Sequence, residues 1–386
     1  MVKSLELRKF VAPEFIFGVD ARNLTGQYAR NFGARMALVV TDPGVIAAGW
    51  TADVTASLAA SHIPYTIFSQ VSPNPRAEEV MAGVDCYQRH SCDVIVAVGG
   101  GSPMDCAKGI GIVSTNKEHI LQFEGIDQVA SPMPPLICIP TTGGTGAEVS
   151  QFAIISNRQA LIKIAIVSKA VVPDVALIDP LTLTTMDPFL TACTGIDALV
   201  HAIEAYVSNA QSSVTDLQAL EAIRLVKGHL LDCIIDLDDV EARGKLMLAS
   251  LEAGLAFSNA SLGAVHAMAH SLGGLLDLPH GQCNAVLLQH VVAFNHTAAP
   301  ERFAHIGDAL GLHLQGMTAK QQKTAVITEI NQLREEVGVY HTLSQMGVSR
   351  SDIPQLAKNA LADACIVTNP RRPNRRDIEV IYEEAL

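Results

Sequence analysis

The feature that most limits the fold is a change of periodicity near the middle of the chain. In the first half, short apolar runs alternate with segments of helical periodicity, as in a parallel sheet whose strands are joined by crossover helices. The predicted strands cover residues 36–42, 64–70, 93–101 and 134–142, with weaker signals at 161–168 and 175–180. The predicted helices between them cover 45–60, 77–90 and 104–112.

The strand signals stop before Asp187 and Pro188, which form an N-cap followed by proline at the first helical position. Nearly everything after this pair has helical periodicity, for example DLQALEAIRLVKGHLLDCII and AVHAMAHSLGGLL. A chain of 386 residues also exceeds what one hydrophobic core usually supports. We therefore predict an α/β domain over residues 1–185 and an all-helical domain over residues 186–386.

Composition excludes several classes of partner. The formal charge of −12 repels nucleic acid phosphates and anionic lipids, so we expect neither nucleic acid nor a membrane as a partner. No apolar stretch is long enough to span a membrane, and the first residues lack a signal-peptide core, which indicates a cytoplasmic protein. The eight cysteines form no CxxC pair and are predicted to be reduced and mostly buried.

A glycine cluster, Gly99-Gly100-Gly101-Ser102, follows one predicted strand directly and precedes a helical segment. Glycines there let backbone N–H groups approach an anion, and a helix N-terminus favours negative charge. The spacing is GGGSxxDxAK and not the GxGxxG of the ordinary dinucleotide fingerprint. The cluster therefore predicts a phosphate-binding loop, with a plain tight turn as the alternative.

Two further polar features follow predicted strands. Residues 141–146, TTGGTG, could hydrogen-bond a ribose or diphosphate, or could simply form a turn that caps a helix. Asp42 could accept hydrogen bonds from an adenosine ribose, or could be an N-cap before Pro43. Because the carboxyl ends of parallel strands meet at one edge of a sheet, these features together predict ligand binding along that edge.

The helical half contains a group of potential metal ligands. Asp197 and His201 lie at i and i+4, so one helix face presents both, and His266 and His270 repeat this spacing. His280 follows in a predicted Pro-His-Gly turn. Each residue alone could be a cap or a hydrogen-bonded core group, but several together among apolar neighbours favour a metal site. Carboxylate and imidazole ligands without a thiolate suit Fe²⁺ or Zn²⁺.

These motifs resemble the iron-containing (group III) alcohol dehydrogenases over essentially the whole chain. The resemblance is carried by VVTDPGV, PNP at 73–75, VAVGGGSPMDCAKGI, PTTGGTGAEVS, TGIDALVHAIEAYVS, GAVHAMAHSLGG, LPHGQCNAVLLQHV and TNPR at 368–371. It implies a dinucleotide-binding α/β domain and a helical domain of the dehydroquinate-synthase-like fold. The metal and the substrate would lie in the cleft between these domains.

The resemblance also implies residue roles. The implied metal ligands are Asp197, His201, His266 and His280. His270 would then lie near the nicotinamide as a proton-relay candidate, and Asp105 and Lys108 match further catalytic positions. The implied cofactor contacts are Asp42, Asn74, Gly99, Gly100, Gly101, Ser102, Thr141, Thr142, Thr145, Lys163 and Leu183. The implied substrate-pocket residues are Phe152, Phe257 and Cys365.

The implied activity is hydride transfer between NAD and a small primary alcohol or diol, or its aldehyde. Fe²⁺ is the implied metal, with Zn²⁺ chemically possible, and its role would be to polarise the substrate oxygen. An acid at position 42 should repel a 2′-phosphate, so NAD is favoured over NADP. One departure from the family pattern is Ala147, which stands where the family usually has serine.

Alternative functions remain open at this point. The same fold also serves glycerol dehydrogenase-like polyol oxidation and dehydroquinate-synthase-like lyases, although the GGGSPMDCAK and HAMAHSLGG runs favour the alcohol dehydrogenase branch. A weakly active regulatory or sensor homologue would need the same ligands. As partners we expect a small alcohol or aldehyde and further copies of the chain, in a homodimer or a larger homo-oligomer.

Overall fold

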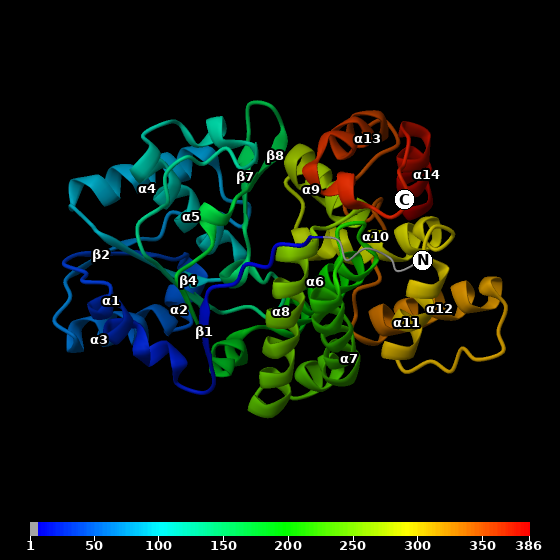
Figure 1. The fold of residues 1–386 in the computed structure, drawn as a ribbon, viewed down its shortest axis with the longest axis horizontal. Helices are drawn as coiled ribbons and strands as arrows, with labels where there is room; N and C mark the ends of the chain where they lie inside the picture. The colour runs from blue at the N-terminus through cyan, green and yellow to red at the C-terminus, as the bar shows by residue number, and fades with distance from the viewer. Residues whose placement is uncertain (1–6) are drawn as a thin grey trace.

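The computed structural model describes residues 7–386 and contains the two predicted kinds of structure side by side (Figure 1). An α/β domain, blue to green in Figure 1, packs against a helical domain, green to red. The predicted fold class is therefore confirmed. Within the described residues, no helix is both long enough and apolar enough to cross a membrane.

The main sheet is parallel throughout and has the strand order β1-β9-β6-β4-β2-β3. Its strands are β1 (Glu14–Phe17), β2 (Ala37–Val40), β3 (Tyr65–Phe68), β4 (Val94–Gly99), β6 (Leu136–Pro140) and β9 (Val175–Ile178). The sheet helices are α1 (Thr25–Asn31), α2 (Pro43–Ala47), α3 (Trp50–Ala60), α4 (Ala77–Arg89) and α5 (Gly101–Asn116).

The apolar strands are explained by burial on both faces. In β4, Ile95 and Ala97 pack into the hydrophobic cluster that contains residues of α4 and α5. Val94 and Val96 of the same strand pack into the opposite cluster, which contains residues of α1 and α3. A strand covered on both faces needs apolar side chains at every position, as the sequence has here.

Three local features differ from the sequence prediction. The segment 45–60 is not one helix, because Gly49 has φ 92° and separates α2 from α3. The short strand β1 was not predicted; it forms the sheet edge, and three of its four residues are exposed. A three-stranded sheet, β5-β8-β7, also lies beside the main sheet, and β7 within it was not predicted. Its strands are β5 (Gly125–Ile126), β7 (Phe152–Asn157) and β8 (Ile162–Val167).

The helical domain contains the helices predicted from the second half of the sequence. They are α6 (Pro188–Val207), α7 (Ser213–Ile235), α8 (Val240–Ala260), α9 (Ala264–Leu276), α10 (His280–Asn295), α11 (Pro300–Ala309), α12 (Ala319–Glu336), α13 (Ile353–Ala362) and α14 (Arg375–Ala385). The prediction of a Pro-His-Gly turn was wrong, because Pro279 is the N-cap of α10 and His280 is its first residue. Short 3₁₀ helices join elements, namely η1 (Ala21–Leu24), η2 (Ile120–Phe123), η3 (Ala147–Val149), η4 (Lys169–Val171), η5 (Pro180–Thr185) and η6 (Ala364–Thr368).

A shared hydrophobic cluster fixes the two domains against each other. It joins Ala176 and Ile178 of β9 to Met247, Leu251 and Leu255 of α8. Apolar surface buried between domains opposes their separation by roughly 25 cal/mol per Å². The carboxyl edge of the sheet is thereby held next to the helices that carry the predicted metal ligands.

Candidate metal centre and active site

Predicted site residues from both domains, including all four predicted metal ligands, line one cavity of about 140 Å³. The sheet domain contributes the start of α5, the 145–154 segment and Lys163 of β8. The helical domain contributes residues of α6, α8, α9 and α10. The cavity therefore lies between the two domains, as the family resemblance implies.

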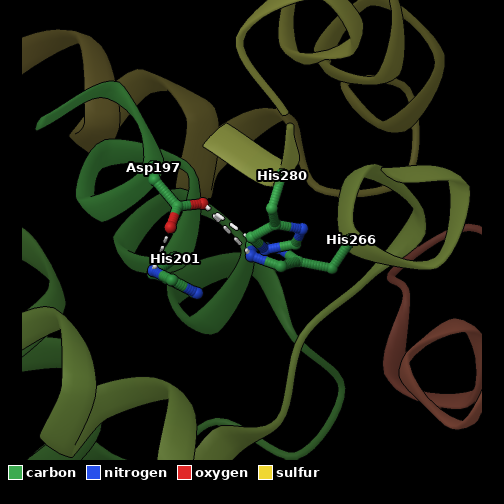
Figure 2. A group of neighbouring side chains, drawn as sticks. All are labelled: Asp197, His201, His266 and His280. Atoms are coloured by element: carbon green, nitrogen blue, oxygen red, sulfur yellow. Dashed lines mark ion pairs between the residues drawn. The ribbon is translucent and has the colours of Figure 1, made fainter. Parts of the chain in front are cut away.

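The four predicted ligands converge at one wall of this cavity (Figure 2). Asp197 and His201 project from α6, while His266 and His280 come from α9 and from the first residue of α10. One ligand atom from each of the four lies within 4.8 Å of the others. Asp197 Oδ1 is 3.7 Å from His266 Nε2 and 3.8 Å from His280 Nε2.

Hydrogen bonds fix the ring orientation of two of these histidines. The Nδ1–H of His201 donates to the carbonyl oxygen of Gly144 over 3.0 Å. The Nδ1–H of His266 donates to Glu204 Oε2 over 2.7 Å. Both rings therefore carry their proton on Nδ1 and leave Nε2 unprotonated, which is the arrangement that metal-binding histidines commonly have.

The protonation states of the predicted ligands also favour the binding of a cation. Burial lowers the pKa of His201 to about 3, and it lowers the pKa values of His266 and His280 well below the usual range, so these imidazoles are neutral at pH 7. Asp197 is 2% exposed and forms no ion pair with lysine or arginine among residues 7–386. Among residues 7–386, the Nδ1 atom of His280 and the Oδ1 atom of Asn284 are buried without hydrogen-bond partners. One carboxylate, three neutral imidazoles and these unpaired atoms fit a divalent metal ion.

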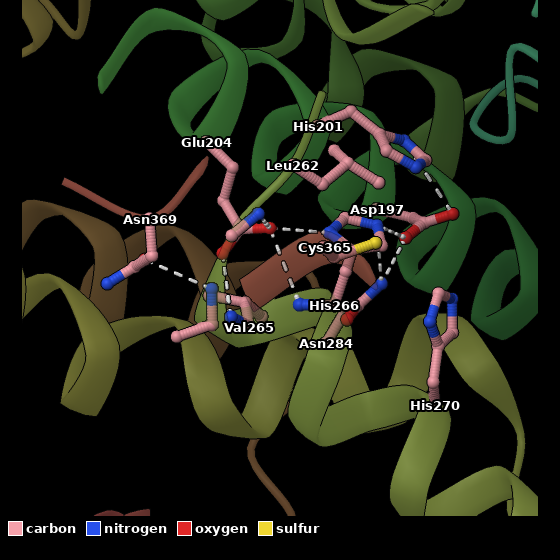
Figure 3. Close-up of polar contacts among 12 residues, drawn as sticks. Asp197, His201, Glu204, Leu262, Val265, His266, His270, Asn284, Cys365 and Asn369 are labelled. Atoms are coloured by element: carbon pink, nitrogen blue, oxygen red, sulfur yellow. Dashed lines mark hydrogen bonds and ion pairs between the residues drawn. The ribbon is translucent and has the colours of Figure 1, made fainter. Parts of the chain in front are cut away.

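Glu204 and Asn284 were not predicted, although both contact the ligands (Figure 3). Glu204 follows Asp197 by seven residues and His201 by three, so it extends the same stripe along α6. The Asn284 amide nitrogen lies 2.5 Å from Asp197 Oδ1, 3.2 Å from His266 Nε2 and 3.1 Å from His280 Nε2. It follows His280 by four residues on α10, and this i, i+4 spacing was the signal that could have identified it.

His270 lines the cavity beside the ligand cluster, with its ring stacked on that of His280 at 5.3 Å. Its Nδ1–H donates to Asp363 Oδ2 over 2.9 Å, so its Nε2 is the free acceptor. Asp363 also accepts the backbone N–H of Cys365 over 2.8 Å. Asp363 was not predicted, because it lies 93 residues from His270 in the chain.

The two glycine-rich loops meet at the carboxyl edge of the sheet. β4 ends at Gly99 with φ 151°, and α5 begins at Gly101, so its free N–H groups face the loop. A Cβ on Gly100 would lie 3.0 Å from Thr142 Oγ1, and one on Gly101 would lie 3.1 Å from Thr145 Cγ2. Thr142 Oγ1 is buried without a hydrogen-bond partner. Bare backbone, a helix N-terminus and an unpaired hydroxyl fit a dinucleotide diphosphate.

Other predicted cofactor residues lie at or near this edge. Asn74, Ser102, Thr145 and Lys163 line the cavity, as do Gly101 and Asp105. Asn74 donates to Asp277 Oδ1 over 2.6 Å, so it ties the sheet domain to the end of α9. Thr141 donates its backbone N–H to Gly99, and Leu183 packs against Gly143. These three contacts are made within the protein itself, and the cofactor roles stay predictions.

Asp42 forms a helix N-cap, which was the alternative to its predicted contact with the adenosine ribose. Its Oδ1 accepts the N–H of Val45 over 2.9 Å and caps α2, with Pro43 as the first helical residue. Its Oδ2 is not used by this cap, so the ribose contact stays a prediction.

Lys108 and Asp105 occupy different environments. Lys108 does not line the cavity; its ammonium group donates to the carbonyl oxygens of Ala147, Ser150 and Phe152 over 2.7–3.0 Å. Asp105 does line it, and burial raises the pKa of Asp105 to about 6, against the opposing effects of the Lys108 charge, a backbone hydrogen bond from Ile154 and the Lys163 charge. The three hydrogen bonds of Lys108 hold the loop that precedes β7 in place.

Replacing Lys108 with methionine is expected to lower the free energy of unfolding by about 3 kcal/mol, because three buried carbonyl oxygens lose their donor. Urea unfolding followed by circular dichroism measures this change, with the exposed Lys320 replaced by methionine as the matched control. A Lys108→Met protein that is as stable as the control but inactive would contradict the structural role.

The substrate side of the cavity is apolar. The rings of Phe152 and Phe257 meet edge-to-face at 5.7 Å, and Phe257 also stacks on His201 at 4.4 Å. Leu262, which was not predicted, completes this wall. Cys365 is fully buried and does not line the cavity, so its predicted substrate contact is not evident in this geometry.

A two-domain fold with a candidate metal site beside a dinucleotide-binding edge fits a metal-dependent oxidoreductase. The family profile described as iron-containing alcohol dehydrogenase matches residues 12–180. The profile described as Fe-containing alcohol dehydrogenase family, C-terminal, matches residues 191–386. The chain belongs to the iron-containing alcohol dehydrogenase family, whose cofactors are Fe²⁺ and NAD.

Several relatives are similar over their full length. The chain is 40% identical to a 1,3-propanediol dehydrogenase of Klebsiella pneumoniae over 371 residues, which are 96% of each chain. It is 36% identical to an NAD-dependent methanol dehydrogenase of Bacillus methanolicus, covering 98% of this chain and 99% of the relative. A solved 1,3-propanediol oxidoreductase superposes with a TM-score of 0.95 at 39% identity, covering 99% of this chain and 100% of that one. These similarities identify an alcohol dehydrogenase, and none of them favours a lyase or a regulatory protein.

Proposed function

We propose that this enzyme interconverts small uncharged primary alcohols or diols and their aldehydes with NAD, using Fe²⁺ held by Asp197, His201, His266 and His280. One observation carries this proposal: the neutral-imidazole cluster shares a cavity of about 140 Å³ with an apolar wall of Phe152, Phe257 and Leu262. That volume admits a short carbon chain, and the apolar wall favours an uncharged substrate, since the lysine of this cavity, Lys163, is a predicted cofactor contact.

The bound metal would supply Lewis-acid polarisation of the substrate oxygen, and NAD would supply the hydride acceptor. The residues of the chain bind the substrate and the dinucleotide and orient them toward each other. Phe152 and Phe257 exclude water from the carbinol carbon, while the Gly99–Ser102 turn and Thr142 hold the diphosphate of the dinucleotide. The carbinol carbon gives up a hydride and the hydroxyl gives up a proton, which leaves the aldehyde.

The proton requires an acceptor at the cavity wall. His270 offers Nε2, because Asp363 holds the proton of that ring on Nδ1. Asp105 lines the same cavity. We propose His270 as the acceptor and Asp105 as a further member of the relay. We further propose a domain boundary at residue 185, a cytoplasmic location and a homo-oligomeric assembly.

The test uses enzyme purified without oxygen, loaded with Fe²⁺ and mixed with NAD. Short alcohols, 1,2- and 1,3-diols, glycerol and a hydroxy acid are compared by NADH absorbance. We expect turnover of uncharged alcohols with one or two hydroxyl groups and none of the hydroxy acid. His266→Ala serves as the inactive reference, and the exposed His313→Ala is the matched active control. No NADH above the His266→Ala background, with Fe²⁺ bound to the wild type, would reject the proposal.

A further inference from the structure

A second cavity, of about 190 Å³, lies within the helical domain between α10, α12 and α14. α12 and α14 lie on the side of the domain away from the sheet, whereas α10 begins at the metal ligand His280 (Figure 1). No residue of this cavity also lines the active-site cavity. Nothing in the alcohol dehydrogenase reaction uses its polar side chains.

Arg334 of α12 is the group in this cavity that most needs a partner. Its side chain lines the cavity although the residue is only 5% exposed, and its Nε–H has no hydrogen-bond partner. The one contact of its guanidinium is to Asn331 Oδ1 at 3.4 Å, and no carboxylate among residues 7–386 pairs with it. A buried cation without a counter-charge is costly.

Another buried arginine of the same protein is neutralised within the chain. Arg22 is 9% exposed and forms ion pairs with Asp53 at 2.8 Å and with Asp179. The two arginines are similarly buried, but only Arg22 has carboxylate partners. Arg334 therefore presents a free guanidinium fork, and this planar group matches a carboxylate with two parallel hydrogen bonds.

Two further polar groups face the same space. His341 Nδ1 is buried without a hydrogen-bond partner among residues 7–386. Gln289 lines the cavity from α10, with its amide nitrogen 3.0 Å from His290 Nε2. The outer lining carries the opposite charge, because Glu335 and Glu384 line the cavity and are solvent-exposed. A buried positive floor beneath an exposed negative rim complements a molecule whose negative end enters first and whose positive end stays outside.

We propose that this cavity binds a small zwitterion of the amino-acid class, with its carboxylate on Arg334 and its ammonium group toward Glu335 and Glu384. A simple carboxylate would bring no positive charge to Glu335 and Glu384, of which only Glu384 has a neighbouring side chain as partner, His290 Nδ1 at 3.7 Å, among the described residues. A phosphate dianion would be repelled by the rim more strongly than a carboxylate. The site is separate from the metal centre, so its ligand is distinct from the alcohol substrate.

Binding is tested on the Fe²⁺-loaded enzyme by thermal-shift measurements and titration calorimetry. The probes are alanine, β-alanine and 4-aminobutyrate, compared with propionate, propylamine and phosphate. We expect saturable binding of at least one amino acid, weaker binding of propionate, and none of propylamine or phosphate. No saturable binding of any of the three amino acids up to about 10 mM would overturn the proposal.

Variants assign the binding to this cavity. Arg334→Lys keeps the charge but loses the fork and is expected to weaken binding at least about tenfold. Glu384→Gln tests the ammonium end without touching the buried arginine and is expected to weaken amino acids but not propionate. Arg372→Leu, at an exposed arginine, is the matched control and should bind as the wild type does. Unchanged amino-acid binding in both Arg334→Lys and Glu384→Gln would overturn the assignment, and unchanged alcohol turnover in these variants verifies that they fold.

Discussion

Replacement of Asp197 by alanine is expected to abolish stoichiometric metal binding and to lower alcohol turnover by at least about 10³-fold. Asp197 is the only carboxylate of the four-residue cluster and lies within 3.7–4.0 Å of the other three ligand side chains. Without it, three neutral imidazoles face the ion and no negative charge offsets its desolvation. Loss of a Lewis acid worth several kcal/mol in the transition state corresponds to this fall in rate.

The same substitution should not destabilise the metal-free fold. Burial raises the pKa of Asp197, which means that the isolated carboxylate is an unfavourable group in its surroundings. Metal content after dialysis, measured by mass spectrometry, and the thermal shift on adding Fe²⁺ together separate the two effects. The wild type should show a metal-dependent shift, and Asp197→Ala should show none while unfolding at no lower temperature than the metal-free wild type.

The exposed Asp308 on α11 provides the control, because its replacement by alanine keeps the buried cluster intact. Asp308→Ala should retain both one metal ion per chain and full turnover. One tightly held metal ion per chain in Asp197→Ala would remove this carboxylate from the ligand set.

Much of this site could be predicted because its residues are close in sequence and share helical spacing. Asp197 and His201 are one helical turn apart, so their common direction follows from the helix alone. The glycine loop is likewise local, since β4 and α5 are consecutive elements. The apolar runs of the sheet were predictable because both faces are covered, as the two clusters around β4 confirm.

The features that were missed depend on distant partners. Glu204 contacts His266 across 62 residues of chain, and Asp363 contacts His270 across 93. An arginine on a helix such as α12 is ordinarily exposed, and the burial of Arg334 depends on segments that are distant in sequence, such as α10 and α14, which line the same cavity. β1 and β7 are short and gain their pairing from β9 and β8, so their local pattern carried little information.

Glu204→Gln is expected to weaken metal binding about 10- to 100-fold while leaving the four ligands in place. The Glu204 carboxylate accepts the His266 Nδ1–H and also the backbone N–H groups of Gly263, Val265 and His266 (Figure 3). All four partners are donors, and a glutamine offers only one acceptor oxygen, so its amide must turn N–H groups toward some of them. His266 then loses both its fixed tautomer and part of the negative charge that strengthens it as a ligand.

A variant at Asn369 distinguishes the two roles of Glu204, which are orienting His266 and capping α9. Asn369 Oδ1 accepts the N–H of Ala264 over 3.0 Å, so it also caps the start of α9 but does not contact the His266 ring. Asn369→Ala is therefore expected to lower the unfolding temperature with little change in metal affinity, whereas Glu204→Gln should lower the affinity itself. Competition with a chelator of known affinity measures both variants without recourse to turnover. Equal metal affinity in Glu204→Gln and the wild type would show that Glu204 only caps α9. Its backbone contacts would then explain its burial, and it would have no role in orienting His266.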